Sequence, residues 1–560
     1  MELTGAQLLV KALKMEGTKH IFGVSGSAVL PIMDVLYHDR EVRYIQSQHE
    51  QGAMYMANGY ARATRALGVC LVSPGPGSTN CLSGVGQAFY TSTSSLLICI
   101  ESGTEHLGLG TSLHHDLDSV AVFKPVTKLA IRVERIDRLV ESIQKAFNVA
   151  LSGRRGPVYL GIPKDILSAQ IDDKVLSRKR YPVETAPRAT SESIRRTADI
   201  LLAGKRPVAL AGGGAVWSQA QEVLLELAEH LAMPVAFSRD NKGLIPEDHI
   251  LALGAVGLAS TPWSLQAMQS ADVLLAVGCT FGEFTTRMFG HEVVPEGVQI
   301  IQIDIDPTEI GKIYPVTQGI FGDARTVLQD LLEEVKKRNI DRRPLEEVPW
   351  IQQLMQAKKQ WRESLAPLET SDQAPILWPR LLRDLRRALP RNAIVSAVSG
   401  STCSWFNYGF EALAHTCSTG GWHPLGSEYP ESLGVQVALP DRVVVCLIGD
   451  GAMMMTLQEI ATAAAYDIPM LCVVSHNGFF GNMRQTQITR FGGRFMGTDL
   501  PIPNLSNIAR ELGAYAERVE DPAEIIPAVG RALGSGKASL LEVMMDTSDE
   551  NLVPGPRRKG

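Results

Sequence analysis

Short apolar runs bounded by glycine, proline or serine recur along this chain and alternate with segments of helical periodicity. In the N-terminal part these runs cover residues 68–72, 96–100 and 156–163. Apolar runs of this length, without a polar residue at every second position, are typical of strands buried on both faces of a sheet. Their alternation with helices predicts a parallel sheet covered by helices.

The same alternation returns twice more, which predicts three units rather than one. Two polar segments interrupt it and are interpreted as linkers: one near 170–190, and one across 335–373 that is charged and has a helical pattern. We therefore predict an α/β protein of three tandem, doubly wound parallel-sheet domains, spanning 1–175, 190–340 and 376–550. The further strands that we expect lie at 206–211, 272–278 and 299–304 in the second unit, and at 393–398, 442–448 and 469–474 in the third.

Charge and cysteine usage argue against several classes of function. The 54 Lys and Arg residues nearly balance 60 Asp and Glu, so no nucleic-acid partner is expected. No apolar segment of about 18 residues occurs, so we expect neither a membrane span nor export. The cysteines show no CxxC or Cys/His spacing, which predicts reduced thiols in a cytoplasmic protein.

The most informative motif joins the ends of two predicted strands. Gly449, Asp450 and Gly451 follow one apolar run and precede a helix-like run over 452–466. Asn477 ends the next strand, with 25 residues between Gly451 and Asn477. That spacing suits one strand-helix-strand crossover, so Asp450 and Asn477 should emerge at the same sheet edge. A carboxylate, an amide oxygen and the backbone carbonyl of Phe479 would suit Mg²⁺. Taken alone, Gly-Asp-Gly could equally be an ordinary loop.

In this arrangement the sequence resembles the thiamine diphosphate enzymes, which include acetolactate synthase, pyruvate oxidase, pyruvate decarboxylase and benzoylformate decarboxylase. Their cofactor motif is Gly-Asp-Gly followed after about 25 residues by Asn, as it is here. The segment 43–62 is similar to the one that carries the family's cofactor-activating glutamate, at the position of Glu50. The turn 73–80, with Pro76 and Asn80, is similar to the turn beside the cofactor's pyrimidine ring. The resemblance spans nearly the whole chain.

The resemblance implies a pyrimidine-binding domain, a central domain and a diphosphate-binding domain, and it assigns a role to individual residues. Glu50 would hydrogen-bond the pyrimidine and favour the tautomer that removes the C2 proton of thiamine. Leu425 would be the apolar wedge that folds the cofactor, and backbone groups of His423 and Leu425 would hold the aminopyrimidine. The implied diphosphate contacts are Gly400, Ser401 and Thr402, in a loop that could equally be a turn. The other residues implied to bind the cofactor are Gly449, Gly451, Ala452, Gly481 and Asn482, and Asn482 should also line the pocket.

Residues on the substrate side are also implied. Ser27 matches a position that faces the reacting carbon, and His114 with His115 resembles a histidine pair that transfers protons in some decarboxylases. Adjacent histidines in a polar loop are, alternatively, only solvated. Gln485 should line the pocket, and Met483 stands where enzymes that release an aldehyde carry a glutamate. This favours the acetolactate synthase pattern.

We therefore expect 2-oxo acid decarboxylation followed by acyl transfer, in a homodimer or homotetramer with the cofactor between subunits. An alternative is an acyl-CoA lyase or decarboxylase, resembling 2-hydroxyacyl-CoA lyase or oxalyl-CoA decarboxylase, or an enzyme like sulfoacetaldehyde acetyltransferase. Here the basic tail 557–559 would form a lid over phosphate groups. A catalytically silent homologue is a third reading. The glycines 212–214 could take FAD or ADP, but the flavin-type arginine is absent at 278–282. Glu428, close to the wedge, could touch substrate.

Overall fold

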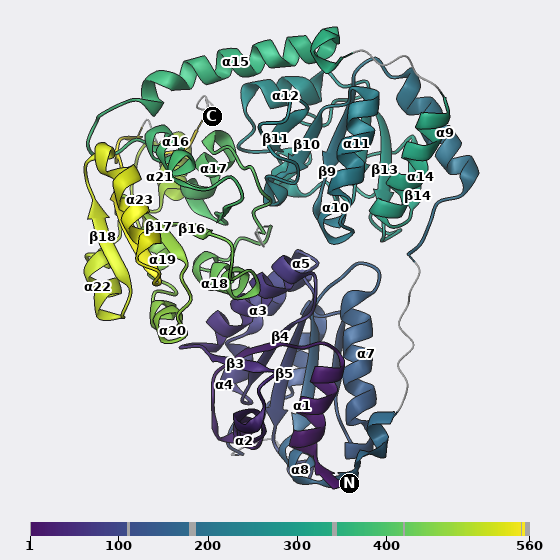
Figure 1. The fold of residues 1–560 in the computed structure, drawn as a ribbon, viewed down its shortest axis with the longest axis vertical. Coiled ribbons are helices and arrows are strands. Elements are labelled where there is room, and N and C mark those ends of the chain that lie inside the picture. Colours follow the sequence, from purple (N-terminus) through teal and green to yellow (C-terminus); the bar gives the residue numbers. More distant parts are fainter. Residues whose placement is uncertain are drawn as a thin grey trace.

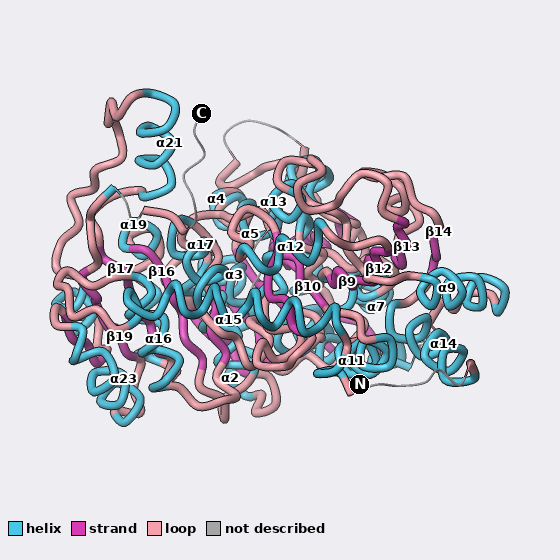
Figure 2. Tube along the Cα trace, turned by 90° about the horizontal axis from the view of Figure 1, so that it is seen from above, coloured by secondary structure: helices cyan, strands magenta, loops and turns pink. Residues whose placement is uncertain are grey.

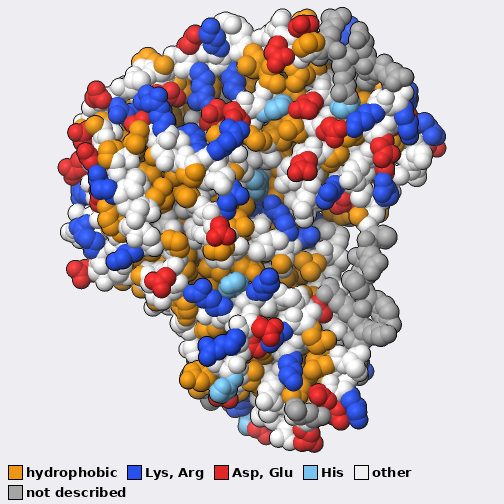
Figure 3. Space-filling view, in the orientation of Figure 1, with side chains coloured by type: hydrophobic (Ala, Val, Ile, Leu, Met, Phe, Trp, Pro, Cys, Tyr) orange, Lys and Arg blue, Asp and Glu red, His pale blue; other side chains and the backbone are white. Residues whose placement is uncertain are grey.

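The computed structural model describes residues 2–108, 113–177, 186–338, 344–417, 421–549 and 552–554. Three parallel sheets of six, six and five strands, each with helices packed on it, confirm the predicted fold class. They form three units along the ribbon of Figure 1, coloured from purple through teal to yellow. Acidic and basic side chains are interspersed over the face in Figure 3. No helix among the described residues is both long and apolar enough to cross a membrane.

The N-terminal sheet is built from strands β2 (His20–Gly23), β3 (Arg43–Gln46), β4 (Gly68–Val72), β5 (Ser95–Glu101), β6 (Leu129–Arg132) and β7 (Val158–Pro163). Their spatial order is β3-β2-β4-β5-β7-β6, all parallel. The order reverses direction between β2 and β4, and such switch points are where ligands bind in open α/β sheets. The main helices are α1 (Gly5–Met15), α2 (Leu30–His38), α3 (Glu50–Thr64), α5 (Leu82–Tyr90) and α7 (Leu139–Leu151), and a short antiparallel pair joins β1 (Glu2–Thr4) to β8 (Gln170–Asp172).

The central sheet has the order β11-β10-β9-β12-β13-β14, again all parallel, with its switch point between β9 and β12. Its strands are β9 (Pro207–Ala211), β10 (Val235–Ser238), β11 (Ala252–Val256), β12 (Val273–Val277), β13 (Gln299–Asp304) and β14 (Gln318–Phe321). The covering helices are α9 (Ser191–Ala203), α11 (Gln221–Leu231), α12 (Pro262–Gln269) and α14 (Ala324–Lys337), and the short α10 (Gly213–Trp217) follows β9.

The C-terminal sheet has the order β15-β16-β17-β19-β18. Its strands are β15 (Ile394–Ser396), β16 (Val444–Gly449), β17 (Leu471–His476), β18 (Tyr515–Val519) and β19 (Ser539–Met544). The helices are α16 (Trp378–Ala388), α17 (Gly400–Gly409), α18 (Glu428–Ala438), α19 (Asp450–Met453), α20 (Glu459–Ala465), α21 (Gly481–Phe491), α22 (Leu505–Glu511) and α23 (Ile525–Gly534). The segment 452–466, expected to run as one helix, is therefore divided between α19 and α20.

The segment expected to be a charged helical linker into the third unit contains a helix with a packed apolar face. Helix α15 (Pro349–Glu369) buries Trp350, Leu354 and Trp361 and contacts α12 and α16. It crosses from the central to the C-terminal unit along one edge of the molecule (Figure 1). Its apolar residues are spaced along one stripe, so low overall hydrophobicity concealed a buried face.

Helices α3 and α18 cross in direct backbone contact, which joins the N-terminal unit to the C-terminal one. A Cβ atom on Gly59 would lie 2.0 Å from the carbonyl oxygen of Glu431, and one on Gly434 would lie 2.0 Å from that of Met56. Only glycine permits this approach. The crossing matters for function because α3 begins with Glu50, and α18 follows directly on the segment that contains Leu425.

Candidate active site

Glu50 is the first residue of α3, and its carboxylate lies against the glycine-rich turn after β4. The side-chain amide of Asn80 donates to Oε2 of Glu50 at 2.9 Å. A Cβ on Gly77, in the short helix α4 (Pro76–Thr79), would lie 3.5 Å from Oε1 of Glu50, so the backbone of the turn passes close to this carboxylate. Pro76 starts α4. The structure thus brings together Glu50, Pro76 and Asn80.

Asp450 lies at the carboxyl end of β16 and is the first residue of α19. Its carboxylate is buried and accepts hydrogen bonds from the backbone N–H groups of Gly451 at 2.7 Å, Asn477 at 3.0 Å and Gly478 at 2.6 Å. Burial raises the pKa of Asp450, while these three hydrogen bonds act in the opposite direction. The Oδ1 atom of Asn477 accepts from the N–H of Phe479 at 3.3 Å. Asp450 and Asn477 therefore meet at one sheet edge.

This sheet edge has the oxygen ligands that the magnesium ion of a bound diphosphate needs. No cluster of three or more His, Cys, Asp or Glu side chains suited to a metal occurs among the described residues. Mg²⁺, however, takes few side chains from a protein, and the oxygens of Asp450 and Asn477 keep unused lone pairs. Gly400 and Gly478 have φ values of 68° and 76°, and a Cβ on either would meet nothing within 4 Å. The donor set and the open glycine loops fit the cofactor.

The other predicted diphosphate contacts gather at the same edge. Gly400, Ser401 and Thr402 form the first turn of α17, and the hydroxyl of Thr402 lies 3.0 Å from that of Ser475 on β17. A Cβ on Gly481 would lie 2.8 Å from Oγ of Ser401, so the start of α21 is adjacent to the start of α17. Ala452 is buried in α19, and Asn482 is half-buried on α21.

Hydrogen bonds fix the segment 423–426, which contains the expected wedge residue Leu425. His423 adopts a left-handed backbone conformation with φ 50°, and its Nδ1 lies 2.7 Å from the carbonyl oxygen of Val398. Leu425 is half-buried. Gly426 donates its N–H to Oε2 of Glu428 at 3.0 Å, and its carbonyl accepts from Thr456 at 2.7 Å.

The sequence left the role of Glu428 open, and the structure shows its hydrogen-bond partners. Its carboxylate is 1% exposed and accepts from Ser399 as well as from the N–H of Gly426. Burial raises the pKa of Glu428. The carboxylate therefore ties the wedge segment to the residue that precedes α17.

The substrate-side residues lie on two different units. The rings of His114 and His115 stack with centroids 3.6 Å apart, and His115 packs against Gly75 in the turn beside Glu50. Ser27 is exposed, directly after Gly26, at which a Cβ would lie 2.4 Å from the hydroxyl of Ser73. Gln485 lies on α21 of the C-terminal unit, a helix that stands out from the body of the molecule in Figure 2.

The pyrimidine-side and metal-side residues do not interact within one chain. Among the described residues, no hydrogen bond joins Glu50 or Asn80 to Asp450 or Asn477. The C-terminal residue that bonds the three residues before Glu50 is instead Glu459, a side chain that the sequence did not single out. It follows no glycine-rich motif, so only the three-dimensional structure reveals it.

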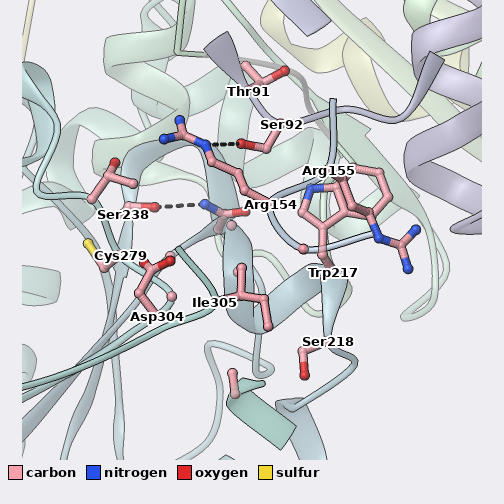
Figure 4. A pocket seen from close by; sticks show the side chains of 18 of the residues that line it. Thr91, Ser92, Arg154, Arg155, Trp217, Ser218, Ser238, Cys279, Asp304 and Ile305 are labelled. Carbon is pink, nitrogen blue, oxygen red and sulfur yellow. Dashed lines mark hydrogen bonds between the residues drawn. The ribbon is translucent and has the colours of Figure 1, made fainter. Parts of the chain in front are cut away.

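A cavity of about 840 Å³ opens at the switch point of the central sheet. Gly212 after β9, Gly278 after β12 and Asp304 at the end of β13 line it. Burial raises the pKa of Asp304 to about 6. Figure 4 shows Arg154 donating to Ser92, and Arg155 beside the ring of Trp217. These basic residues, which come from the N-terminal unit, were not foreseen.

Family models match all three units. Residues 3–122 match the N-terminal TPP binding domain of thiamine pyrophosphate enzymes, residues 194–331 the central domain, and residues 399–543 the C-terminal TPP binding domain. The chain is also similar to characterised relatives along almost its whole length. It is 33% identical to a probable acetolactate synthase large subunit of Methanocaldococcus jannaschii, over 98% of this chain and 93% of the relative.

The chain belongs to the thiamine diphosphate-dependent enzymes.

Two further relatives narrow the comparison within this family. Acetolactate synthase isozyme 3 large subunit of Escherichia coli is 32% identical over 100% of this chain and 97% of its own length. The acetolactate synthase large subunit of Corynebacterium glutamicum is 33% identical over 95% and 84%. This thiamine diphosphate enzyme is therefore acetolactate synthase-like, as the motif pattern predicted.

Proposed function

We propose that this enzyme decarboxylates a 2-oxo acid and transfers the remaining acyl group to the carbonyl of a second 2-oxo acid. With pyruvate in both roles, two molecules would give one acetolactate and one CO₂. The proposal rests on one combination: similarity to acetolactate synthase large subunits over nearly the whole chain, together with a Glu50–Asn80 pair and an Asp450–Asn477 pair. The cofactors we infer are thiamine diphosphate and Mg²⁺.

Each half of the site has a distinct task. Thiamine diphosphate, when bound, supplies the carbon nucleophile that adds to a carbonyl and retains the electron pair left by CO₂. Glu50 would hold a proton at N1′ of the pyrimidine, oriented by the hydrogen bond from Asn80. Asp450, Asn477 and the backbone carbonyl of Phe479 would hold Mg²⁺. The glycine loops at 400–402, 449–452 and 481–482 would contact the diphosphate.

The remaining predicted residues would shape the substrate side. Leu425 and the backbone of His423 would orient the aminopyrimidine and thiazolium rings. His114 or His115 could donate a proton to an alkoxide, since imidazole titrates near neutral pH. Ser27 would approach the reacting carbon, and Gln485 would contact the acceptor.

A complete site would require two subunits. Among the described residues, no hydrogen bond joins the Glu50–Asn80 pair to the Asp450–Asn477 pair of the same chain. We therefore infer that Glu50 of one protomer faces Asp450 of its partner in a cytoplasmic homodimer or homotetramer. The exposed Trp422, Met454 and Met455 near the metal-side loops suit burial in such an interface. Sedimentation of the active enzyme tests this, because a monomer with full turnover would contradict it.

The central cavity is proposed to bind a nucleotide such as FAD or ADP. Arg62 lines the cavity and is only 3% exposed, and its Nε has no hydrogen-bond partner among the described residues. Arg154, which also pairs with Glu309 at 2.6 Å, and Arg155 add two further positive charges, and a phosphate group would supply the acceptor that Nε of Arg62 lacks. Native mass spectrometry of the purified protein would reveal bound thiamine diphosphate, flavin or ADP.

Substitution of Glu50 tests the proposed function. The Glu50→Gln enzyme should bind thiamine diphosphate with Mg²⁺ but lose turnover of pyruvate, measured as CO₂ and acetolactate released. Wild-type turnover in this variant would refute the assignment. Release of CO₂ from oxalyl-CoA or cleavage of a 2-hydroxyacyl-CoA, with pyruvate inert, would instead favour the acyl-CoA reading. The basic tail 557–559 invoked there lies outside the described residues.

A further inference from the structure

One carboxylate of the C-terminal unit holds the three residues that immediately precede Glu50. Oε2 of Glu459 accepts from the hydroxyl of Ser47 at 2.9 Å and from the N–H of Gln48 at 3.2 Å. Oε1 accepts from the N–H of His49 at 3.1 Å. The residue after His49 is Glu50, so this network ends one residue before the predicted activating glutamate.

Glu459 is fully buried and fully engaged. Its exposed fraction is 0%, and a fourth donor, the hydroxyl of Thr462 on the same helix, lies 2.7 Å from Oε2. Burial raises the pKa of Glu459, and the four donated hydrogen bonds oppose that rise. All four partners are donors, which suits a carboxylate because it only accepts. A carboxylate this deep is tolerated only when it is satisfied in this way.

The surroundings leave this carboxylate little freedom. A Cβ on Gly52 would lie 2.3 Å from Oε1 of Glu459, so the first turn of α3 packs directly on it. Two further hydrogen bonds hold the preceding strand, β3. The N–H of Gln46 donates to the hydroxyl of Tyr466 at 2.8 Å, and Arg43 donates to the carbonyl of Tyr466 at 3.1 Å. The start of α3 is thus fixed by the C-terminal unit of the same chain.

We propose that Glu459 is a positioning residue, which sets the placement of the Glu50 carboxylate by clamping the Ser47–His49 backbone at the entry of α3. This inference rests on the proposed role of Glu50. Glu459 also follows Asp450 by nine residues along one segment, through α19 and into α20. The segment that begins at the metal side therefore also supports the activating glutamate of its own chain. That glutamate would serve the neighbouring site in a dimer.

The Glu459→Gln holoenzyme provides the direct test. The amide nitrogen replaces one carboxylate oxygen and in either orientation faces a backbone N–H donor, that of His49 or that of Gln48, so at least one of the hydrogen bonds is lost. Exchange of the C2 proton of bound thiamine diphosphate for deuterium, followed by acid quench and NMR, reports cofactor activation without turnover. We expect exchange to slow roughly 10- to 100-fold, the effect of displacing a catalytic group by about 1 Å. Affinity for thiamine diphosphate with Mg²⁺, measured by calorimetry, should stay near wild type.

Two other variants keep the test decisive. Ser47→Ala removes one donor without touching Glu459 and should slow exchange by a smaller factor; it decides the question if Glu459→Gln does not fold. Asp384→Asn is the matched control, because Asp384 is a buried carboxylate of the same unit, paired with Arg380 and Arg383 on α16. It should lower the melting temperature and leave exchange unchanged.

The outcomes separate this inference from the proposed function. Wild-type exchange in folded Glu459→Gln and in Ser47→Ala would overturn the positioning role, as would equal slowing in Asp384→Asn. If Glu50→Gln slows exchange while both Ser47 and Glu459 variants do not, only the positioning role fails. If Glu50→Gln itself exchanges at the wild-type rate, the proposed function fails with it.

Discussion

The crossing of α3 and α18 gives a sharp stability prediction for Gly59→Ala. The added methyl carbon would lie 2.0 Å from the carbonyl oxygen of Glu431, against backbone rather than a movable side chain. Reaching ordinary van der Waals contact requires the two helices to separate by roughly 1.4 Å. Overpacking of this kind costs about 1–3 kcal/mol, partly offset by about 0.5–1 kcal/mol from replacing a helical glycine. We expect a net loss of about 1–2 kcal/mol.

Gly530 supplies the matched control within the same protein. It lies inside α23, and a Cβ there would meet nothing within 4 Å. Gly530→Ala should therefore stabilise the protein by about 0.5–1 kcal/mol, through helix propensity alone. The two substitutions are chemically identical, so the difference between them isolates the clash.

Hydrogen exchange read by mass spectrometry is the appropriate assay, because a chain of three domains need not unfold in one step. In Gly59→Ala, peptides from α3 and α18 should lose protection, while those from the central sheet stay unchanged. C2 exchange on bound cofactor should also slow, because α3 begins with Glu50. Protection of α3 equal to that in Gly530→Ala would refute the close crossing of these helices.

Three further outcomes follow from the site and the cavity. Asp450→Asn should weaken Mg²⁺-dependent binding of thiamine diphosphate, measured by calorimetry, because a metal ligand loses its charge while the amide also donates toward the N–H groups of Asn477 and Gly478. Leu425→Ala should lower kcat far more than it raises KM for pyruvate in steady-state assays, since the proposed wedge would orient cofactor rather than bind substrate. Asp304 has a folded pKa of about 6, above the ordinary 3.8, so its burial costs no stability below pH 3.8 and progressively more as pH rises through 6, by about 3 kcal/mol. Asp304→Asn should therefore raise the melting temperature at pH 8 but not at pH 4.

The sequence was most informative where one local pattern implies one structure. Buried strands such as 68–72 and the motif around Asp450 are bounded by glycines, and each lies in a parallel sheet with its carboxyl end at a shared edge. The crossover length then brought Asp450 and Asn477 together without knowledge of the fold. The glycines 212–214, which the sequence offered as a possible FAD or ADP site, line the central cavity, and the nucleotide itself stays a prediction.

Features set by long-range packing could not be predicted in this way. Helix α15 was expected as part of a helical linker, but its buried face was not predicted because it depends on helices from two other units. The expected helix over 452–466 breaks between α19 and α20, where Thr456 turns back to bond the carbonyl of Gly426. Glu428 and Glu459 are ordinary helix-initiating glutamates in sequence, and only their distant partners make them buried and bonded.

Helix α3 is held by the C-terminal unit at two places of different physical kind. At Gly59 the contact is steric and allows no side chain, so it fixes the separation of the helices. At Glu459 the contact is polar and directional, so it fixes the path of the chain that enters α3. A steric contact alone would let the helix slide along its axis, and hydrogen bonds alone would let it tilt. Together they constrain both motions of α3. The first residue of this helix is Glu50, which is predicted to contact the cofactor.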